Sequence, residues 1–207
     1  RGLSDIIAID SQGRSLVRGL IVDNFMVGDL GYGGRPGNPG EQYFELPGGQ
    51  EGWYSLSTVI GDPAQILGSE REVDVTEAPG GLNGTVWRIG PRSNVPGGQF
   101  ALSSPPITVP IATVTWDGIG TSHGGLGGVD LTRDGIDDRF LARFISTDQD
   151  AELTLVVEDH LEQSASLKIS TPRDLAGGDF IEFPYQLFGL PGEDIVGTVD
   201  FTSIVSI

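Results

Sequence analysis

Alternation of apolar and polar residues over short segments is the feature that most limits how this chain can fold. Aliphatic residues occupy every second position at 153–157 and again at 165–169, and a polar turn at 159–162 separates the two segments. A period of two is typical of a strand that packs one face on a core and turns the other to water. The pattern therefore predicts antiparallel strands joined by tight turns.

Glycine and proline point to the same class. The 207 residues include 32 glycines and 13 prolines without a repeat period, which suits many short strands better than helices or collagen. Further strands are expected at 16–25, 53–60, 70–75, 85–89, 99–102, 112–116 and 199–207. We predict an all-β fold, a two-sheet antiparallel β-sandwich of the jelly-roll type with about a dozen strands and little helix. Residues 20–207 are expected to form this single domain.

The charge of the chain excludes some partners. Its formal net charge is −17, from 29 acidic and 12 basic residues, so duplex nucleic acid should be repelled. The absence of cysteine excludes disulfides, thiolate zinc sites and cysteine nucleophiles. An acidic surface stays hydrated at high ionic strength and offers oxygen ligands to divalent cations, so we expect an extracellular, saline setting. No segment is expected to span a membrane.

The segment 124–146 joins a glycine-rich loop, an acidic cluster and a strand that should bury Phe140. Four carboxylates lie within nine residues of it, on Asp130, Asp134, Asp137 and Asp138. Calcium accepts about six to eight oxygen ligands in flexible geometry, so these four are candidate calcium ligands. The alternative is that Asp134 and the following glycine form a turn while the other carboxylates cap backbone groups or face solvent.

Arg71 is expected to be a buried structural charge. It alternates with Val73 and Val75, whereas acidic residues occupy the positions between them. Because an isolated buried guanidinium is very unfavourable, we predict that Arg71 pairs with a carboxylate or several carbonyls.

Aromatic residues surround the glycine-rich stretch 28–52, which reads as a long exposed loop. Tyr32, Tyr43, Trp53 and Tyr54 lie in or beside it and are candidates for stacking on sugar rings. The alternative is that they pin the loop to the body of the protein. The sequence thus leaves a glycan as one candidate ligand.

Both ends of the chain are apolar and strand-like. Residues 1–19 form an additional N-terminal segment with Ile6, Ile7 and Ile9, which pairs with 15–25, with another part of the chain, or with a neighbouring molecule. The other end includes Val205 and Ile207. Unprotected strand edges are templates for pairing with another chain, so these five residues are candidates for self-association by strand addition.

Nothing in the sequence singles out a catalytic group. His123 and His160 are its two histidines, and no motif distinguishes a catalytic pair among the acidic residues. We therefore predict that the protein is not an enzyme.

Ordered landmarks along the chain resemble the ectodomains of exported bacterial proteins of the PEP-CTERM type, which are substrates of exosortases. The landmarks are 21–25, 66–73, 114–118, 127–132 with 138–140, 183–185 and 199–204. The resemblance implies a jelly-roll-like sandwich, export to the bacterial cell surface or matrix, and no enzymatic activity. We expect an extracellular structural subunit of a surface layer, matrix or filament, or alternatively a carbohydrate-binding or adhesion module with structural calcium.

Overall fold

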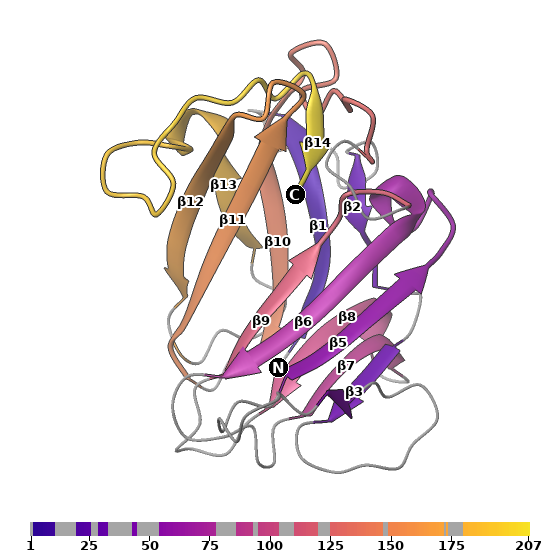
Figure 1. Ribbon diagram of the computed structural model, residues 1–207. Coiled ribbons are helices and arrows are strands. Elements are labelled where there is room, and N and C mark those ends of the chain that lie inside the picture. The colour runs from indigo at the N-terminus through magenta and orange to yellow at the C-terminus, as the bar shows by residue number, and fades with distance from the viewer. Residues whose placement is uncertain are drawn as a thin grey trace.

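The computed structural model of the protein is built almost entirely of β-strands (Figure 1). It describes residues 2–10, 20–25, 29–32, 43–44, 54–77, 86–92, 95–103, 110–119, 125–146, 149–171, 173 and 180–207. Over these residues, helical structure is limited to two short 3-10 turns, η1 (Leu67–Ser69) and η2 (Tyr185–Leu187). The strand pairs are antiparallel, so the predicted all-β class is confirmed.

The largest sheet has seven strands. Its order is β13-β10-β1-β8-β7-β3, and β2 also pairs with β1. The bounds are β13 (Phe180–Pro184), β10 (Asp137–Ser146), β1 (Gly2–Asp10), β8 (Val95–Ser103), β7 (Val86–Arg92), β3 (Asp29–Tyr32) and β2 (Ile21–Asp23).

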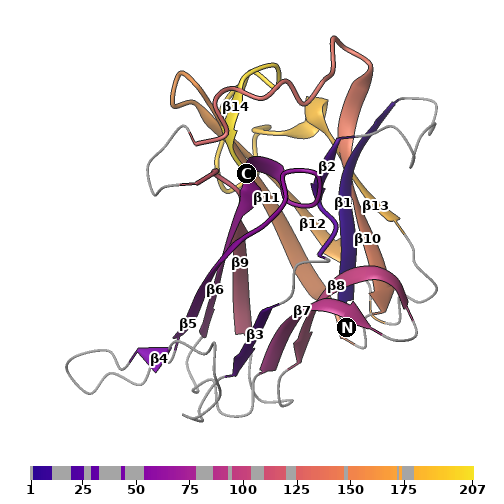
Figure 2. The ribbon, with the colours of Figure 1, turned by 90° about the vertical axis from the view of Figure 1, so that its right-hand side faces the viewer.

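Two smaller sheets complete the described fold. One has the order β12-β11-β14, with β12 (Ser164–Thr171), β11 (Ala151–Asp159) and β14 (Ile204–Ser206). The other has the order β4-β5-β6-β9, with β4 (Tyr43–Phe44), β5 (Tyr54–Ile60), β6 (Glu70–Glu77) and β9 (Pro110–Thr115). In Figure 1, β11, β12, β6 and β9 lie in front of the large sheet, and Figure 2 shows this separation from the side. Trp116 and Ile207 exchange backbone hydrogen bonds of 2.9 and 3.0 Å, which join the end of β9 to the end of β14.

One hydrophobic core is shared by all three sheets. Its buried members include Phe140 of β10, Val157 of β11 and Val73 of β6. Strand β11 follows the alternation in the sequence, because Leu155 and Val157 are buried whereas Thr154, Val156 and Glu158 are not. In its partner β12, Ser166 is buried together with Ala165 and Leu167. The burial of apolar residues in one cluster is the main stabilising contribution to such a fold.

The N-terminal strand is an integral part of the large sheet. Of the pairings that the sequence left open, it has those within its own chain, with β2 of the segment 15–25 and with β10 and β8. Along β1, Ile6 lies opposite Ala142 of β10 on one edge and opposite Asp23 of β2 on the other. Ile7 is likewise paired on both edges, with Leu141 and Ile21. Ile9 pairs with Arg139. The backbone groups that strand addition requires are therefore used within the chain.

The C-terminal strand is also enclosed. Ile204 pairs with Asp159 of β11 and, on its other edge, exchanges backbone hydrogen bonds with Val129. Val205 and Ile207 are buried. The expectation that these residues form a free edge is therefore wrong, since the strand fills the space between β11 and the end of β9.

Candidate functional site

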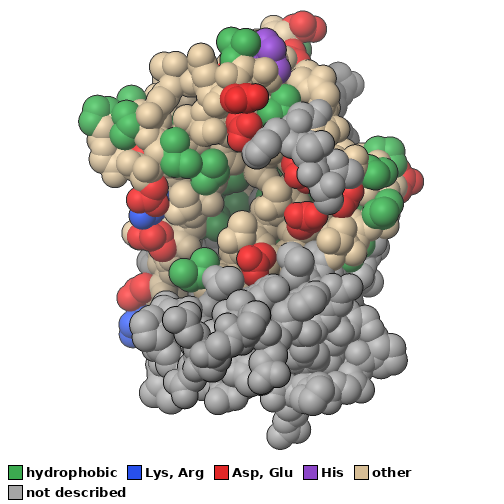
Figure 3. All heavy atoms as spheres, in the orientation of Figure 1, with side chains coloured by type: hydrophobic (Ala, Val, Ile, Leu, Met, Phe, Trp, Pro, Cys, Tyr) green, Lys and Arg blue, Asp and Glu red, His purple; other side chains and the backbone are tan. Residues whose placement is uncertain are grey.

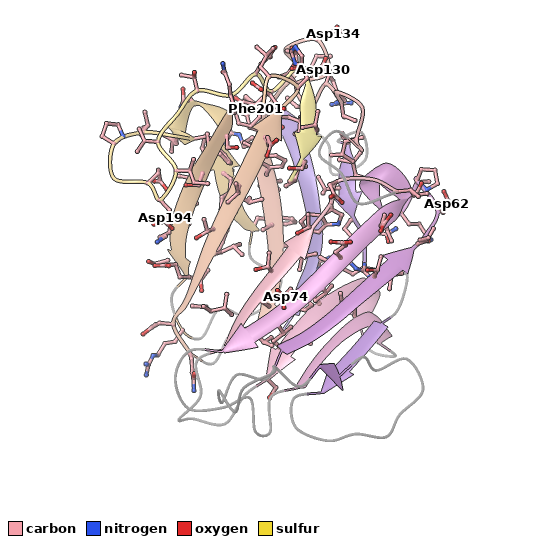
Figure 4. The ribbon with its side chains drawn as sticks, viewed as in Figure 1. Asp62, Asp74, Asp130, Asp134, Asp194 and Phe201 are labelled. Atoms are coloured by element: carbon pink, nitrogen blue, oxygen red, sulfur yellow. The ribbon has the colours of Figure 1, made fainter. Side chains whose placement is uncertain are left out.

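Two turns of the same sequence pattern lie side by side at one end of the molecule. Residues 129–132 and 199–202 both read Val-Asp-apolar-Thr. In each, the Asp carboxylate accepts a hydrogen bond from the Thr amide, at 2.8 and 2.9 Å, and another from the Thr hydroxyl, at 2.6 and 2.7 Å. The Leu131 amide donates to the Phe201 carbonyl at 2.9 Å, which joins the turns. Figure 4 shows Asp130 and Phe201 near each other at this end.

The first turn opens the loop that leads into β10. Asp130 accepts a further hydrogen bond of 2.8 Å from the amide of Asp134. Hydrogen bonds to the ionised carboxylate, first of all the one from the Thr132 hydroxyl, lower the pKa of Asp130. Gly135 has a φ of 80°, a conformation that suits glycine at the tight tip of the loop.

The four carboxylates that were expected to bind one calcium ion lie in four different environments and contact different partners. Asp130 caps its own loop, and Asp134 is exposed at the tip. Asp137 is buried and accepts hydrogen bonds from two nitrogens of Arg133, and Asp138 pairs with Arg139 at 2.7 Å. Among the described residues, no group of three or more metal-ligating side chains converges. Asp130 and Asp134 thus fit the turn and capping alternative, whereas Asp137 and Asp138 form ion pairs that neither alternative described.

Tyr185 of η2 packs between the two turns. Its ring is stacked on Phe201, with centroids 4.1 Å apart and planes 12° from parallel, and meets Phe140 edge-on at 5.2 Å. Its hydroxyl donates to the Leu131 carbonyl at 3.2 Å. Burial raises the pKa of Tyr185, and the charges of Asp137 and Asp138 raise it further. The tyrosine is thus a fixed, neutral aromatic platform.

Two hollows meet at Tyr185 and Gln186, and together they form the candidate site, here called the Tyr185 site. The first has a volume of about 370 Å³ and is lined by Thr132, Gly135, Asp137, Asp138, Arg139, Pro184, Tyr185 and Gln186. The second has a volume of about 310 Å³ and is lined by Tyr185, Gln186, Phe188, Gly197, Thr198, Val199 and Phe201. Volumes of this size suit small ligands.

An ion-pair network forms one wall of the first hollow. The guanidinium of Arg139 on β10 contacts Asp138 at 2.7 Å and Glu182 of the neighbouring strand β13 at 2.6 Å. Asp138 is the main cause of the raised pKa of Arg139. Because β10 and β13 are hydrogen-bonded neighbours, the sheet itself sets the position of these side chains.

Arg71 lies in a separate, structural centre. Its Nη1 contacts Asp23 Oδ2 at 2.9 Å, and both side chains are fully buried. Asp23 Oδ2 also accepts a hydrogen bond from the indole of Trp116 at 3.0 Å, and Asp23 Oδ1 accepts one from the amide of Phe25 at 2.6 Å. The Arg71 guanidinium lies 5.8 Å from the centroid of the Phe25 ring. This centre connects β2, β6 and the end of β9.

The aromatic residues predicted to bind sugar are divided between sheets. Tyr43 and Tyr54 lie on the paired strands β4 and β5, and Tyr32 lies on β3 of the large sheet. Trp53 lies outside the described residues. No signal in the sequence indicated Tyr185 and Gln186, although three of the residues that line the first hollow, Thr132, Asp137 and Asp138, belong to or adjoin the acidic cluster at 130–138.

His160, the one histidine within the described residues, does not line the Tyr185 site. His160 forms a 2.7 Å hydrogen bond with Ser203 at the exposed surface, and neither residue lines the two hollows. His123 is outside the described residues.

A helix with the length and apolar character needed to cross a membrane does not occur in the described part of the chain.

Comparison with known proteins leaves the resemblance to PEP-CTERM ectodomains as a prediction from the sequence. The chain was compared with protein-family models, with curated proteins and with solved structures, and none of the three comparisons found a match.

Proposed function

We propose that this protein is a non-catalytic, extracellular bacterial binding module that holds a glycan at the Tyr185 site. The observation that carries the proposal is the lining of the first hollow, where an aromatic ring lies beside carboxylates, a guanidinium and an amide. Sugar rings have apolar faces that pack on aromatic rings and hydroxyls that hydrogen-bond to such polar groups. The volume of about 370 Å³ suits a short glycan segment.

The rigidity of the site supports a binding role. Tyr185 is held by its stack on Phe201 and by its hydrogen bond to Leu131. The loop that carries Asp137 is closed by a 2.8 Å hydrogen bond from the Asp137 amide to the Thr132 carbonyl. A ligand would therefore meet side chains that are already in place, which lowers the entropic cost of binding.

The pairing of the carboxylates supports a role without catalysis. Glycoside hydrolysis requires one carboxylic acid that donates a proton and one carboxylate that acts as base or nucleophile. Asp137 is held by Arg133, and both Asp138 and Glu182 are held by Arg139. Their oxygens already accept hydrogen bonds from these arginines, so a substrate would have to displace a guanidinium group to use any of them.

The arrangement of the sheets supports a jelly-roll sandwich as the scaffold. The two small sheets lie over the large one, share its core and are joined through Trp116 and Ile207. In this proposal the small sheets together form one layer and the seven-stranded sheet forms the other. Loops at one end of such a sandwich are common places for binding sites.

A titration followed by residue-resolved NMR tests the glycan proposal. A panel of oligosaccharides should include at least one that shifts the signals of Gln186 and Asp138, and Gln186→Ala should weaken its binding by about fivefold. Asp194→Asn is the control, because Asp194 is an exposed, ion-paired carboxylate that does not line the site. The proposal fails if no glycan shifts these signals, or if Gln186→Ala and the control bind equally well.

A structural subunit is the second candidate function, and an exposed loop favours it. Within the loop 189–197, Leu190, Ile195 and Val196 are exposed, and Val196 has an exposed fraction of 62%. The backbone hydrogen bond from Gly197 to Gly189, of 3.2 Å, closes the neck of this loop, which projects on the left of Figure 1 and carries apolar surface in Figure 3. Self-association through this loop predicts concentration-dependent sedimentation that Val196→Glu abolishes. Sedimentation as a monomer at all concentrations would exclude this candidate.

A further inference from the structure

The charged groups around the Tyr185 site are unequal in number and exposure. Four carboxylates, on Asp130, Asp137, Asp138 and Glu182, lie in or beside the lining of the first hollow, against two guanidinium groups on Arg133 and Arg139. The exposed fractions of the Asp138 and Glu182 side chains are 45% and 51%, whereas that of Arg139 is 20%. Among the charged side chains that line the first hollow, a ligand therefore meets the Asp138 carboxylate more readily than the Arg139 guanidinium group.

The two arginines are already engaged. Arg133 donates to both carboxylate oxygens of Asp137, and Arg139 donates to Asp138 and Glu182. Binding an anion would require a guanidinium to exchange one of these partners for the ligand, and would also place the anion beside the carboxylates. Binding of an acidic ligand is therefore disfavoured both by the loss of an existing ion pair and by repulsion from the carboxylates.

The remaining groups favour a ligand that donates hydrogen bonds. The Asp138 carboxylate can only accept hydrogen bonds, and beside those from Arg139 its 45% exposed side chain keeps lone pairs for further donors. Gln186 supplies an amide that both donates and accepts. The Tyr185 hydroxyl is used by the Leu131 carbonyl. Hydroxyl groups satisfy such a wall, and a protonated amine satisfies it while also compensating its negative charge.

We propose that the Tyr185 site selects glycans that carry protonated amino groups and rejects glycans that carry carboxylates. This inference rests on the proposed glycan-binding function and names the class of sugar. The amine lies against Asp138, and the face of the sugar ring packs toward Tyr185. A sugar without charge binds with intermediate affinity, because it retains the hydrogen bonds and lacks the charge interaction.

Three matched ligands test the selection, namely β-1,4-linked tetramers of glucosamine, glucose and glucuronate, measured at a pH where the amine is protonated. Affinity should fall in that order, and added salt should weaken glucosamine binding most, since it screens the exposed charges. Asp138→Asn should weaken binding of the glucosamine tetramer by about three- to tenfold and leave the glucose tetramer within about twofold. The folding of this variant is checked by its melting temperature, and Glu182 still pairs with Arg139.

Asp194→Asn is the matched control, because Asp194 is similarly exposed and is paired with Lys168 at 2.7 Å. This variant should bind all three tetramers as the parent does. Binding of the glucuronate tetramer as tightly as the glucosamine tetramer, with shifts at Gln186, would overturn the selection and leave the glycan-binding function intact. If none of the tetramers or the wider panel binds at this site, the glycan-binding function itself fails, and the selection fails with it.

Discussion

The strongest prediction concerns the buried pair of Asp23 and Arg71. In Asp23→Ala, the fully buried guanidinium of Arg71 loses its carboxylate partner at 2.9 Å. The indole N–H of Trp116 loses its acceptor at 3.0 Å, and the amide of Phe25 loses one at 2.6 Å. One substitution therefore removes the carboxylate that faces a buried guanidinium and leaves two donors in the core without their acceptor.

The expected loss is large on the scale of a folded domain. Removal of one partner of a buried ion pair costs about 3–5 kcal/mol, and the unsatisfied indole adds about 1 kcal/mol or more. A total of at least about 4 kcal/mol is a large part of the roughly 5–15 kcal/mol that stabilises a typical domain. For a chain of 207 residues, this corresponds to a decrease in melting temperature of about 10 °C or more.

Urea denaturation followed by tryptophan fluorescence and circular dichroism measures this loss. Asp150→Ala is the control, because the pair of Asp150 and Arg173 is exposed and its loss should cost less than about 0.5 kcal/mol. The double variant Asp23→Leu with Arg71→Met should recover much of the stability, since it removes both charges and retains apolar volume. An Asp23→Ala variant as stable as the parent would refute the reasoning.

The remaining predictions concern pH and calcium. Burial raises the pKa of Asp74, so its ionised form destabilises the fold at neutral pH. This destabilisation disappears as the pH falls through the raised pKa, because the carboxyl group becomes neutral. Asp74→Asn should therefore raise the melting temperature at neutral pH and not at acid pH. Hydrogen bonds lower the pKa of Asp130, so its contribution is present above the unfolded-state pKa and is lost as the pH falls through the folded-state value. Asp130→Ala should cost about 0.5–1 kcal/mol in urea denaturation at neutral pH and almost nothing at acid pH, and equal losses at both would contradict this assignment. Calcium should change the melting temperature by less than about 1 °C, because Asp130, Asp137 and Asp138 already have protein partners; a concentration-dependent rise of several degrees would show that these carboxylates rearrange around the ion.

Local patterns were sufficient to predict the class of the fold and some of its details. The alternation of apolar and polar residues indicates which face of a strand is buried, and it can be seen in neighbouring residues alone, as in strand β11. The same alternation on β6 indicated that Arg71 faces the core, where the structure places it. The glycine-rich acidic segment before β10 was recognisable as a loop because its residue types favour turns.

Partners distant in the sequence were decided only by the tertiary structure. Asp23 is 48 residues from Arg71, and the two turns that surround Tyr185 are 70 residues apart, so no local pattern connects them. The strands that β1 and β14 pair with also depended on the whole fold. The sequence of an apolar strand does not show whether it pairs within its own chain or with another chain. The sequence thus indicated many of the strands and some of their buried faces, through local backbone preference and hydrophobicity. It did not indicate β3 and β4, which lie in the stretch 28–52 expected to be a loop, or β13. The pairing of β1 with its neighbours, the burial of β14 and the meeting of three segments at the Tyr185 site required the three-dimensional packing of the core.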